Sequence, residues 1–460
     1  MNIKTAFYRY PWIILILVLT ACIPGVGSGP GGTIAMPTEA PMTVTAQITQ
    51  TAPMQATATA LPTETLPAST PTPLPLFPLD NLRMAYMVDG NIYLQDGSKA
   101  PVQLTNSSED RDPIFSDDGK KIVFYRGKIN NNVYSVNPDG GQEQTLITND
   151  WLTALGPETM AGSLTFVPKT HQLLFKTYLC EVGGLYAIPP CEISIYLADT
   201  DTGKIKGPLA SGLNGDVRVT PFSISPDGKL LSVATLEHLD ILSIQGRLIR
   251  RNIMTYFPTE SGKVFPRQYW LPDSSGLIVA LPMDAYNDPT QPINYTVWRY
   301  TLDQNKATQI PLDPPLMELG CDLLVSPIIS PDRNWLVYET LGGQLHLGNL
   351  KDDHTILYDY DSACHHSWSP SSKYFVYAQG SNDEFFLGAV DEPPVSIGYI
   401  DFLGWVDANH YIYNSSPYRS KEKKKILVGE IVNEKIIMNY DSGFSLSGKF
   451  NGLAFVVLDK

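Results

Sequence analysis

The sequence predicts an all-β protein, a β-propeller of four-stranded blades. One pattern recurs seven times along it: an apolar stretch, a tight turn rich in Ser, Pro, Asp and Gly, and a second apolar stretch. A third stretch follows, in which apolar and polar residues alternate as they do along a β-strand. Repetition of one antiparallel unit about every 40 to 50 residues is typical of propeller blades.

Each of the seven turns predicts a β-hairpin. The clearest copies run from Ile114 to Phe124 and from Phe222 to Val233. In such turns Pro presets the backbone angle φ, Asp hydrogen-bonds to its own backbone, and Gly adopts the left-handed conformation of a bulged hairpin. The residue before the Pro or Asp recurs at positions 116, 167, 225, 271, 330, 369 and 406. These intervals lie close to the length of one blade, with the excess in loops.

The third stretch of the unit can be counted separately, and it occurs eight times. Its copies begin at residues 91, 132, 193, 240, 296, 344, 384 and 425. Eight third strands against seven internal hairpins indicate that the first blade lacks a complete hairpin of its own.

The C-terminus offers the missing strands. Segments 444–449 and 453–458 are typical of one more hairpin. If this hairpin pairs with the N-terminal strands at 84–88 and 92–94, the two ends of the chain share the first blade and two exposed sheet edges disappear. The count favours eight blades. Seven blades is the alternative, because joining the C-terminal hairpin to the N-terminal strands supplies about one strand too many for the first blade.

The two clearest turns carry a family resemblance. They read F-S-x-D-G-K and F-S-x-S-P-D-G-K, each ahead of a strand of the N-I-Y type, and they resemble the TolB-type, WD-like propeller repeats of bacterial envelope proteins. The resemblance covers roughly residues 82–460, and the other copies depart from it at the Asp or Gly. It implies a propeller domain over residues 80–460 that serves as a binding platform, as a gate on a peptidase or, occasionally, as an enzyme.

Residues 1–22 have the pattern of a secretion signal. Lys4 and Arg9 precede an apolar run from Trp12 to Leu19, which is too short to cross about 30 Å of hydrocarbon as a helix. The run ends in Leu-Thr-Ala-Cys, which resembles the lipobox of bacterial lipoproteins. This resemblance implies that Cys22 is the lipidated first residue of the mature chain. Ordinary cleavage nearby, with Cys22 incidental, is the alternative.

Residues 23–79 are expected to form a disordered tether. Pro and Thr dominate there, Glu39 and Glu64 are the only charges, and aromatic residues are absent until Phe77. Such a composition buries too little apolar surface to offset the entropy of ordering. A Pro-rich chain of this length reaches at most about 170 Å, and a flexible coil about 40 Å. We therefore expect an extracytoplasmic domain held clear of the membrane that anchors it.

The charge balance narrows the class of partner. The formal net charge is −14 with 17% charged residues, which argues against nucleic acid and against electrostatic docking on anionic lipid. The expected ligand is a protein, peptide or glycan, and the membrane is reached through the lipid anchor alone. Three long connections, at 180–191, 283–294 and 312–323, are suited to recognition because loops often carry function.

Four cysteines besides Cys22 are disulfide candidates, and an even number is typical of an oxidising compartment. Cys180 and Cys191 flank a Gly- and Pro-rich connection between two predicted strands, while Cys321 and Cys364 lie at similar positions in adjacent repeats. A disulfide that closes a loop of about ten residues stabilises the fold by about 2 to 3 kcal/mol. No C-x-x-C spacing occurs, so these cysteines are not expected to bind a metal.

Catalytic signatures are sparse. No G-x-S-x-G nucleophile elbow occurs in the sequence. His354, His365 and His366, with His346 nearby, are the candidate metal or acid/base residues, but a propeller lyase would need further ligands from other blades. We therefore expect a lipid-anchored binding or scaffold propeller that needs no cofactor and is not an enzyme. A surface polysaccharide lyase or hydrolase is the alternative.

Overall fold

The structure is a computed structural model, in which the chain divides into two units between Thr70 and Pro71. It describes residues 77, 80–127, 132–180, 191–209, 221–235, 237–256, 265–283, 293–318, 329–340, 344–352, 354–359, 363–379, 384–414, 425–432, 436–445 and 450–458. The predicted signal and almost all of the predicted tether lie outside these residues. Within them, no helix is long and apolar enough to span a membrane.

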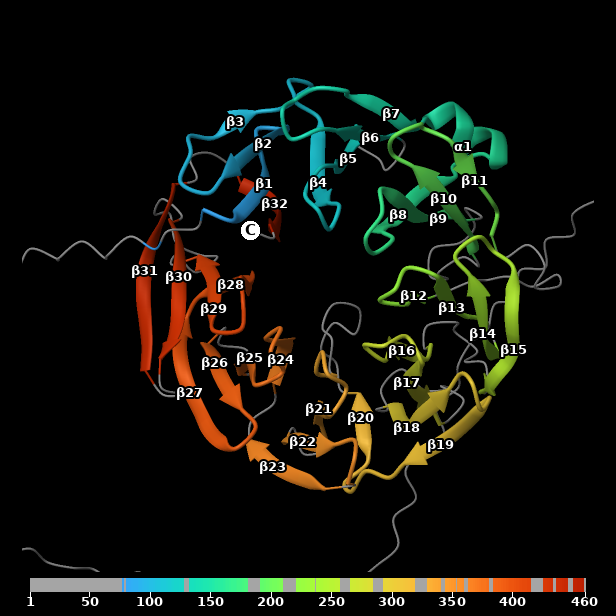
Figure 1. Ribbon diagram of the computed structural model, residues 1–460, viewed down its shortest axis with the longest axis vertical. Helices are drawn as coiled ribbons and strands as arrows, with labels where there is room; N and C mark the ends of the chain where they lie inside the picture. The colour runs from blue at the N-terminus through green and yellow to red at the C-terminus, as the bar shows by residue number, and fades with distance from the viewer. Residues whose placement is uncertain are drawn as a thin grey trace, which may run out of the picture. The chain divides into compact units, whose positions relative to one another are not determined.

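The second unit is a β-propeller of eight four-stranded blades, arranged as a ring with the first strand of each blade near the centre and the fourth at the rim (Figure 1). All pairings are antiparallel. From centre to rim, the strands of the first four blades are β32 (Phe450–Val457), β1 (Leu82–Val88), β2 (Asn91–Asp96) and β3 (Val102–Gln103); β4 (Asp110–Phe115), β5 (Ile122–Arg126), β6 (Asn132–Val136) and β7 (Gln144–Ile147); β8 (Met160–Phe166), β9 (Gln172–Cys180), β10 (Cys191–Asp199) and β11 (Ile205–Lys206); and β12 (Phe222–Ile224), β13 (Leu230–Ala234), β14 (His238–Ser243) and β15 (Leu248–Thr255).

The other four blades continue the same order around the ring. Their strands are β16 (Arg267–Trp270), β17 (Gly276–Pro282), β18 (Ile293–Thr301) and β19 (Lys306–Ile310); the single bridge of Ile329 to Leu336, β21 (Trp335–Glu339), β22 (Leu345–Asn349) and β23 (Thr355–Asp359); β24 (Ala363–Trp368), β25 (Tyr374–Gln379), β26 (Glu384–Ala389) and β27 (Glu392–Tyr399); and β28 (Asp401–Trp405), β29 (His410–Asn414), β30 (Lys425–Val432) and β31 (Ile436–Ser445). One short helix, α1 (Asn149–Leu155), leads into blade 3, and the Thr148 side chain caps it by accepting from the Trp151 N–H.

Strand β20 (Leu316–Glu318) joins two blades. It pairs with β18 of blade 5 and, through Met317 opposite Glu339, with β21 of blade 6. Blades 5 and 6 therefore share one continuous eight-stranded sheet.

The prediction that the two chain ends share the first blade is confirmed. Strand β32 pairs with β1 from Leu82 opposite Val457 to Val88 opposite Phe450. The ring is closed by backbone hydrogen bonds, and the inner edge of β1 is covered. The count of eight blades is confirmed over the alternative of seven.

The expected C-terminal hairpin is wrong in detail. The described residues of its first segment, 444 and 445, end β31, the rim strand of blade 8, and its second segment belongs to β32, the central strand of blade 1. The physical reason is that β31 pairs with β30 at the rim of blade 8, whereas β32 pairs with β1 at the centre of blade 1. The apparent surplus strand is thereby accounted for.

The recurrent turns are held by one side-chain arrangement. In blade 2 the Ser116 hydroxyl donates to Asp118 Oδ1 at 2.8 Å and accepts from the Lys121 N–H at 3.0 Å. Ser225 with Asp227 and Ser330 with Asp332 repeat this geometry, and each of these serines is fully buried. The Ser-x-Asp pattern in the sequence is thus the chemistry of the turn itself.

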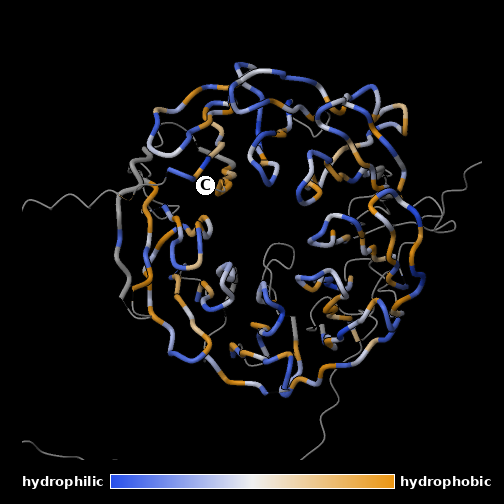
Figure 2. Tube along the Cα trace, viewed as in Figure 1, coloured by the Kyte–Doolittle hydropathy of each residue, from blue (hydrophilic) through white to orange (hydrophobic). Residues whose placement is uncertain are grey.

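The core is divided into eight apolar clusters, one between each pair of neighbouring blades. Successive residues of a strand enter opposite clusters: Leu173 packs between blades 2 and 3, and Leu174 between blades 3 and 4. Figure 2 shows hydrophobic stretches around the whole ring, interspersed with hydrophilic ones. Each blade is therefore stabilised on both faces by its neighbours.

Candidate functional site

An open depression of about 570 Å³, lined mainly by charged and amide side chains and called the cavity below, lies over blades 1, 2 and 3. Its lining residues come from turns or from strand ends beside them: Arg83, Asp96, Lys120, Lys121, Asn137, Pro138, Asp139, Gln142, His171 and Asp201. The turns lie between the first and second or the third and fourth strands of a blade. Since alternate connections of an antiparallel meander emerge at the same edge, these turns share one face of the ring, which we call the turn face.

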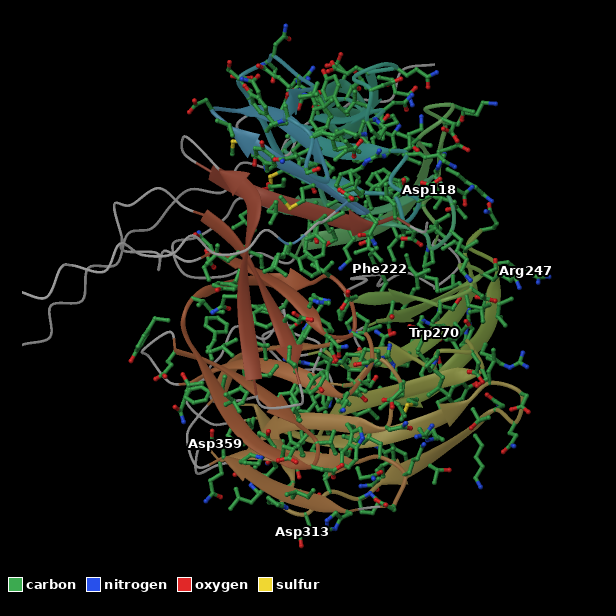
Figure 3. The ribbon with its side chains drawn as sticks, turned by 60° about the vertical axis from the view of Figure 1, so that its left-hand side comes forward. Asp118, Phe222, Arg247, Trp270, Asp313 and Asp359 are labelled. Atoms are coloured by element: carbon green, nitrogen blue, oxygen red, sulfur yellow. The ribbon has the colours of Figure 1, made fainter. Side chains whose placement is uncertain are left out.

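Ion pairs tie the turns of blades 2 and 3 together beneath the cavity. His171 lies between two carboxylates, with Nδ1 at 2.9 Å from Asp201 Oδ2 and Nε2 at 3.2 Å from Asp118 Oδ2. Lys121 Nζ is 3.0 Å from Asp201 Oδ1, and Lys120 Nζ is 3.1 Å from Asp118 Oδ2. We call these five residues the His171 cluster; Asp118 is labelled in Figure 3. The side chain of Lys121 is only 6% exposed, so its charge is held in place.

The surroundings of His171 favour its protonated form. Partial burial alone would lower its pKa, but hydrogen bonds and the charges of Asp201 and Asp118 outweigh burial and raise the pKa. Hydrogen bonds likewise hold the pKa of both carboxyls below the usual range despite partial burial. Both ring nitrogens can donate only when the imidazole is protonated. The cluster is therefore a fixed ionic link between two blades.

Replacement of His171 by Gln is expected to destabilise the domain in a pH-dependent way. The pKa of His171 is raised above 6.5, so its stabilisation is fully present below that value and is lost as pH rises through the raised pKa. The pKa values of Asp118 and Asp201 are lowered from 3.8, so their stabilisation disappears in acid. Solvent screening limits the effect to about 1 kcal/mol.

Thermal melts between pH 5 and pH 9 would measure this effect. The difference in Tm between the wild type and His171→Gln should be largest near pH 5.5 and should shrink toward pH 9. The exposed His354 supplies the matched control, His354→Gln, whose Tm should follow the wild type throughout. A difference that grows with pH would contradict the ionic link.

Arg83 joins blade 1 to the same site. Its guanidinium binds Asp96 through both carboxylate oxygens, at 2.5 and 3.0 Å, and donates to the Gly119 carbonyl of blade 2 at 2.7 Å. A bidentate pair of this kind fixes orientation as well as charge. Three blades thus meet in one polar network at the cavity.

Asn137 stands out among the lining residues. Its backbone holds the turn between β6 and β7, with the Asn137 N–H donating to the Gly141 carbonyl at 2.9 Å. Its side-chain Oδ1 is buried, yet it accepts no hydrogen bond from any residue in the described part of the chain. Buried polar atoms are usually paired, and this oxygen is an exception.

The histidines singled out from the sequence are not brought to this cavity. His354 lies in the exposed turn after β22, and His365 and His366 lie in β24 at a bulge between Cys364 and Ser367. His346 is buried in β22 and stacks on Tyr338 with ring centroids 5.6 Å apart, and burial lowers its pKa.

The metal or acid/base role of His354, His365 and His366 stays a prediction, since the side chains of the last two are not described. Across the described ranges, no group of three or more His, Cys, Asp or Glu side chains could hold a metal ion.

The structure describes only some of the cysteines for which a disulfide or a lipid was predicted. Cys180 ends β9 and Cys191 begins β10, and the two stand directly opposite each other in the strand register. Cys364 lies in β24, whereas Cys22 and Cys321 fall outside the described residues. Both disulfides stay predictions. Residues 181–190 and 284–292 of the first two long connections, and residues 319–323 of the third, also fall outside the described residues, whereas residues 316–318 of the third form strand β20 where a loop was expected.

Sequence reasoning missed the cavity. Asp118 holds its own turn, as the turn pattern predicts for Asp, but it also binds His171 of the next blade. The sequence does contain a local signal for this site. Lys120 and Lys121 follow the turn glycine directly, and His171 lies in the corresponding turn of blade 3.

No protein-family profile and no curated protein matches the sequence. Among solved structures, the chain is similar to an oligogalacturonate lyase in complex with manganese, at 14% identity and a TM-score of 0.44, over 70% of this chain and 87% of that one. It is also similar to dipeptidyl peptidase 4 of Porphyromonas gingivalis, at 12% identity and a TM-score of 0.47, over 74% and 54%. TolB from Acinetobacter baumannii matches at 11% identity and a TM-score of 0.34, over 75% and 81%. The propeller assignment rests on the strand pairing and not on these overlaps.

Proposed function

We propose that the protein is an extracytoplasmic binding module of the cell envelope. A lipid on Cys22 would anchor it, residues 23–79 would tether it, and the turn face of blades 1 to 3 would bind a protein, peptide or glycan. The observation that supports binding most directly is the cavity of about 570 Å³ with its fixed network of charged side chains. Ligand pockets commonly measure about 300 to 1,000 Å³ and are largely preformed.

The geometry supports binding over catalysis at this cavity. A general acid or base needs a titrating group that is free to exchange a proton with the substrate. Both ring nitrogens of His171 lie within hydrogen-bond distance of carboxylates, and Lys121 is paired with Asp201. These groups are engaged in holding blades together. The alternative of a surface lyase or hydrolase would have to be centred elsewhere, at His365 and His366.

Replacement of Cys22 by Ser tests the anchor. We expect the variant to leave the membrane fraction or to remain unprocessed, because several acyl chains on one residue anchor firmly where a single chain is marginal. Fractionation with mass spectrometry of the N-terminus would show this, with Ser28→Ala as the control that leaves the lipobox intact. Membrane retention of a correctly cleaved Cys22→Ser chain would rule out the lipid anchor.

Capture from solubilised envelopes tests the binding role. The full chain is expected to retain a partner that Gln142→Arg loses, because Gln142 is exposed and lines the cavity. Gln304→Arg is the matched control, since Gln304 is an exposed glutamine in blade 5. Equal capture by both variants would place binding elsewhere. Turnover of a polysaccharide without any captured partner would favour the enzyme.

A further inference from the structure

We propose that Lys176 is a nucleophilic amine that captures small aldehydes as imines. Lys176 lies in β9, the second strand of blade 3, and belongs neither to the lining of the cavity nor to the His171 cluster. This reactivity is separate from the binding function proposed above. Three features of the site point to it: apolar surroundings, the lack of a counter-charge, and the access of solvent to the Nζ atom.

The Lys176 side chain lies in the apolar interface between blades 3 and 4. It is on the same face of β9 as Leu174, which packs in the cluster between these two blades. In the strand register it stands opposite Ile195 of β10 and Gly162 of β8. Its Nζ lies 5.0 Å from the centre of the Phe222 ring of blade 4, which is labelled in Figure 3. Such surroundings disfavour the charged ammonium, because they replace little of its hydration.

No charge of opposite sign compensates for the lost hydration. In the described part of the chain, Lys176 Nζ forms no ion pair and donates no hydrogen bond. The buried carboxylate of Asp240 in blade 4 stands on the same side of its sheet, but it accepts from the Asn252 N–H at 2.7 Å and lies 3.4 Å from His238 Nε2. On β9 itself, the Tyr178 hydroxyl is hydrogen-bonded to a serine of β8. Within the described residues, these titratable groups leave Lys176 without a partner.

The surroundings shift the balance between the ammonium and the free amine. Burial lowers the pKa of Lys176 from 10.5 to about 8. At pH 7.5 roughly a quarter of such side chains are neutral, compared with about 0.1% for a lysine of ordinary pKa. Only the neutral amine has the lone pair that attacks a carbonyl carbon, and desolvation is a common way in which proteins activate a lysine.

Solvent still reaches the amine. Lys176 is half-buried, and its Nζ is not among the fully buried polar atoms that lack a partner in the described chain. A small aldehyde can therefore approach it. The nitrogen lone pair forms a bond to the carbonyl carbon, and loss of one water, which takes the carbonyl oxygen and both amine hydrogens, leaves a neutral imine. An apolar interface accommodates this imine better than the ammonium that it replaces.

Limited reductive alkylation of the detergent-solubilised full chain tests the proposal. The probe is substoichiometric formaldehyde trapped with cyanoborohydride, and mass spectrometry of peptides measures the labelling of each lysine. At pH 7.5 we expect Lys176 to be labelled at least about tenfold faster than Lys99 and Lys229, whose side chains are 78% exposed. Partial burial keeps this factor below the full ratio of neutral amines. Labelling of Lys176 no faster than that of the two exposed lysines would overturn the proposal.

The pH dependence separates an activated amine from a merely accessible one. The ratio of labelling at Lys176 to labelling at Lys99 should fall about tenfold between pH 7 and pH 9. The reason is that the neutral fraction of Lys176 levels off above its pKa of about 8, whereas that of an ordinary lysine continues to rise. The ratio also cancels the pH dependence of the reagents. A ratio that does not change with pH would contradict the activation of Lys176.

Lys176→Met separates reactivity from a structural role of the cation. If the ammonium stabilised the interface through the Phe222 ring, the variant would lose stability. We expect instead that its Tm at pH 7 equals or exceeds that of the wild type, because an ammonium without a counter-charge is removed. A lysine whose pKa is lowered destabilises the fold fully below about pH 8 and less as pH rises toward 10.5, so any gain in Tm should shrink over this range. Lys99→Met is the exposed control and should leave Tm unchanged. A Tm below that of the wild type in Lys176→Met would overturn the proposal, since the cation would then be a structural partner of Phe222.

Discussion

Removal of residues 449–460 is expected to abolish the cooperative thermal unfolding of the propeller at ordinary temperatures. The deletion takes away β32, the central strand of blade 1, together with Leu453, Phe455 and Val457, which pack against the cluster between blades 8 and 1. These side chains are partly buried, and their loss costs about 3 to 5 kcal/mol before the broken backbone pairs are counted. Domains are stable by only about 5 to 15 kcal/mol in total.

Circular dichroism melts of the full and truncated chains would measure this loss. Removal of residues 459–460 alone is the control, because β32 and its pairing with β1 remain complete. Addition of a synthetic 449–460 peptide should restore part of the transition, since the site beside β1 is left open. A truncated chain that melts at the wild-type temperature would show that closure does not stabilise the ring.

Asp110→Ala is expected to lower the free energy of unfolding by about 3 to 5 kcal/mol. The Asp110 side chain is fully buried in β4 and binds the Arg126 guanidinium at 2.6 and 3.2 Å. Arg126 also binds Glu143 and lies over the Tyr134 ring at 4.1 Å. Without Asp110 the guanidinium loses its buried counter-charge and keeps only Glu143, whose side chain is 37% exposed.

Chemical denaturation of Asp110→Ala, Arg126→Met and the double variant would separate the pair energy from simple packing loss. The double variant should be more stable than the sum of the single losses implies, because neither charge is then left buried alone. Lys99→Ala is the control, since Lys99 is 78% exposed and 3.9 Å from Asp96, and a change of at most about 0.5 kcal/mol is expected. Additive losses would contradict a coupled pair.

The architecture could be predicted because its signals are local and repeated. The side chains of turn residues such as Ser225 and Asp227 bond within their own hairpin, so the sequence around each turn contains its main cause, although the Asp227 N–H also donates to Ser274 of the next blade. The third strands were found for the same reason, through alternation along a few residues. Closure of the ring by the two chain ends could be predicted from the number of strands alone, without knowledge of contacts between distant residues.

The partners of individual strands were harder to predict. The arms of a hairpin and a crossing between neighbouring blades have similar local sequence, and so β31 and β32 were assigned to one hairpin when they belong to different blades. Strand β20 has three residues and no turn signal of its own, and its place between β18 and β21 depends on tertiary contacts.

The candidate site could not be predicted for a related reason. Its residues run from Arg83 to Asp201 and belong to three blades, so only the ring brings them together. Histidine concentration in the sequence pointed to His365 and His366, whereas His171 stands alone in the sequence and gains its carboxylate partners from the turn of another blade and from its own blade.

The shared sheet of blades 5 and 6 has a consequence for motion. Amide protons in a sheet exchange with solvent when the hydrogen-bonded unit opens, and a strand bonded on both sides opens only with its neighbours. Because β20 is bonded to both β18 and β21, the amides of those two blades should exchange with deuterium at a common rate, as one cooperative block. The remaining blades, joined to their neighbours by side chains, should open one at a time.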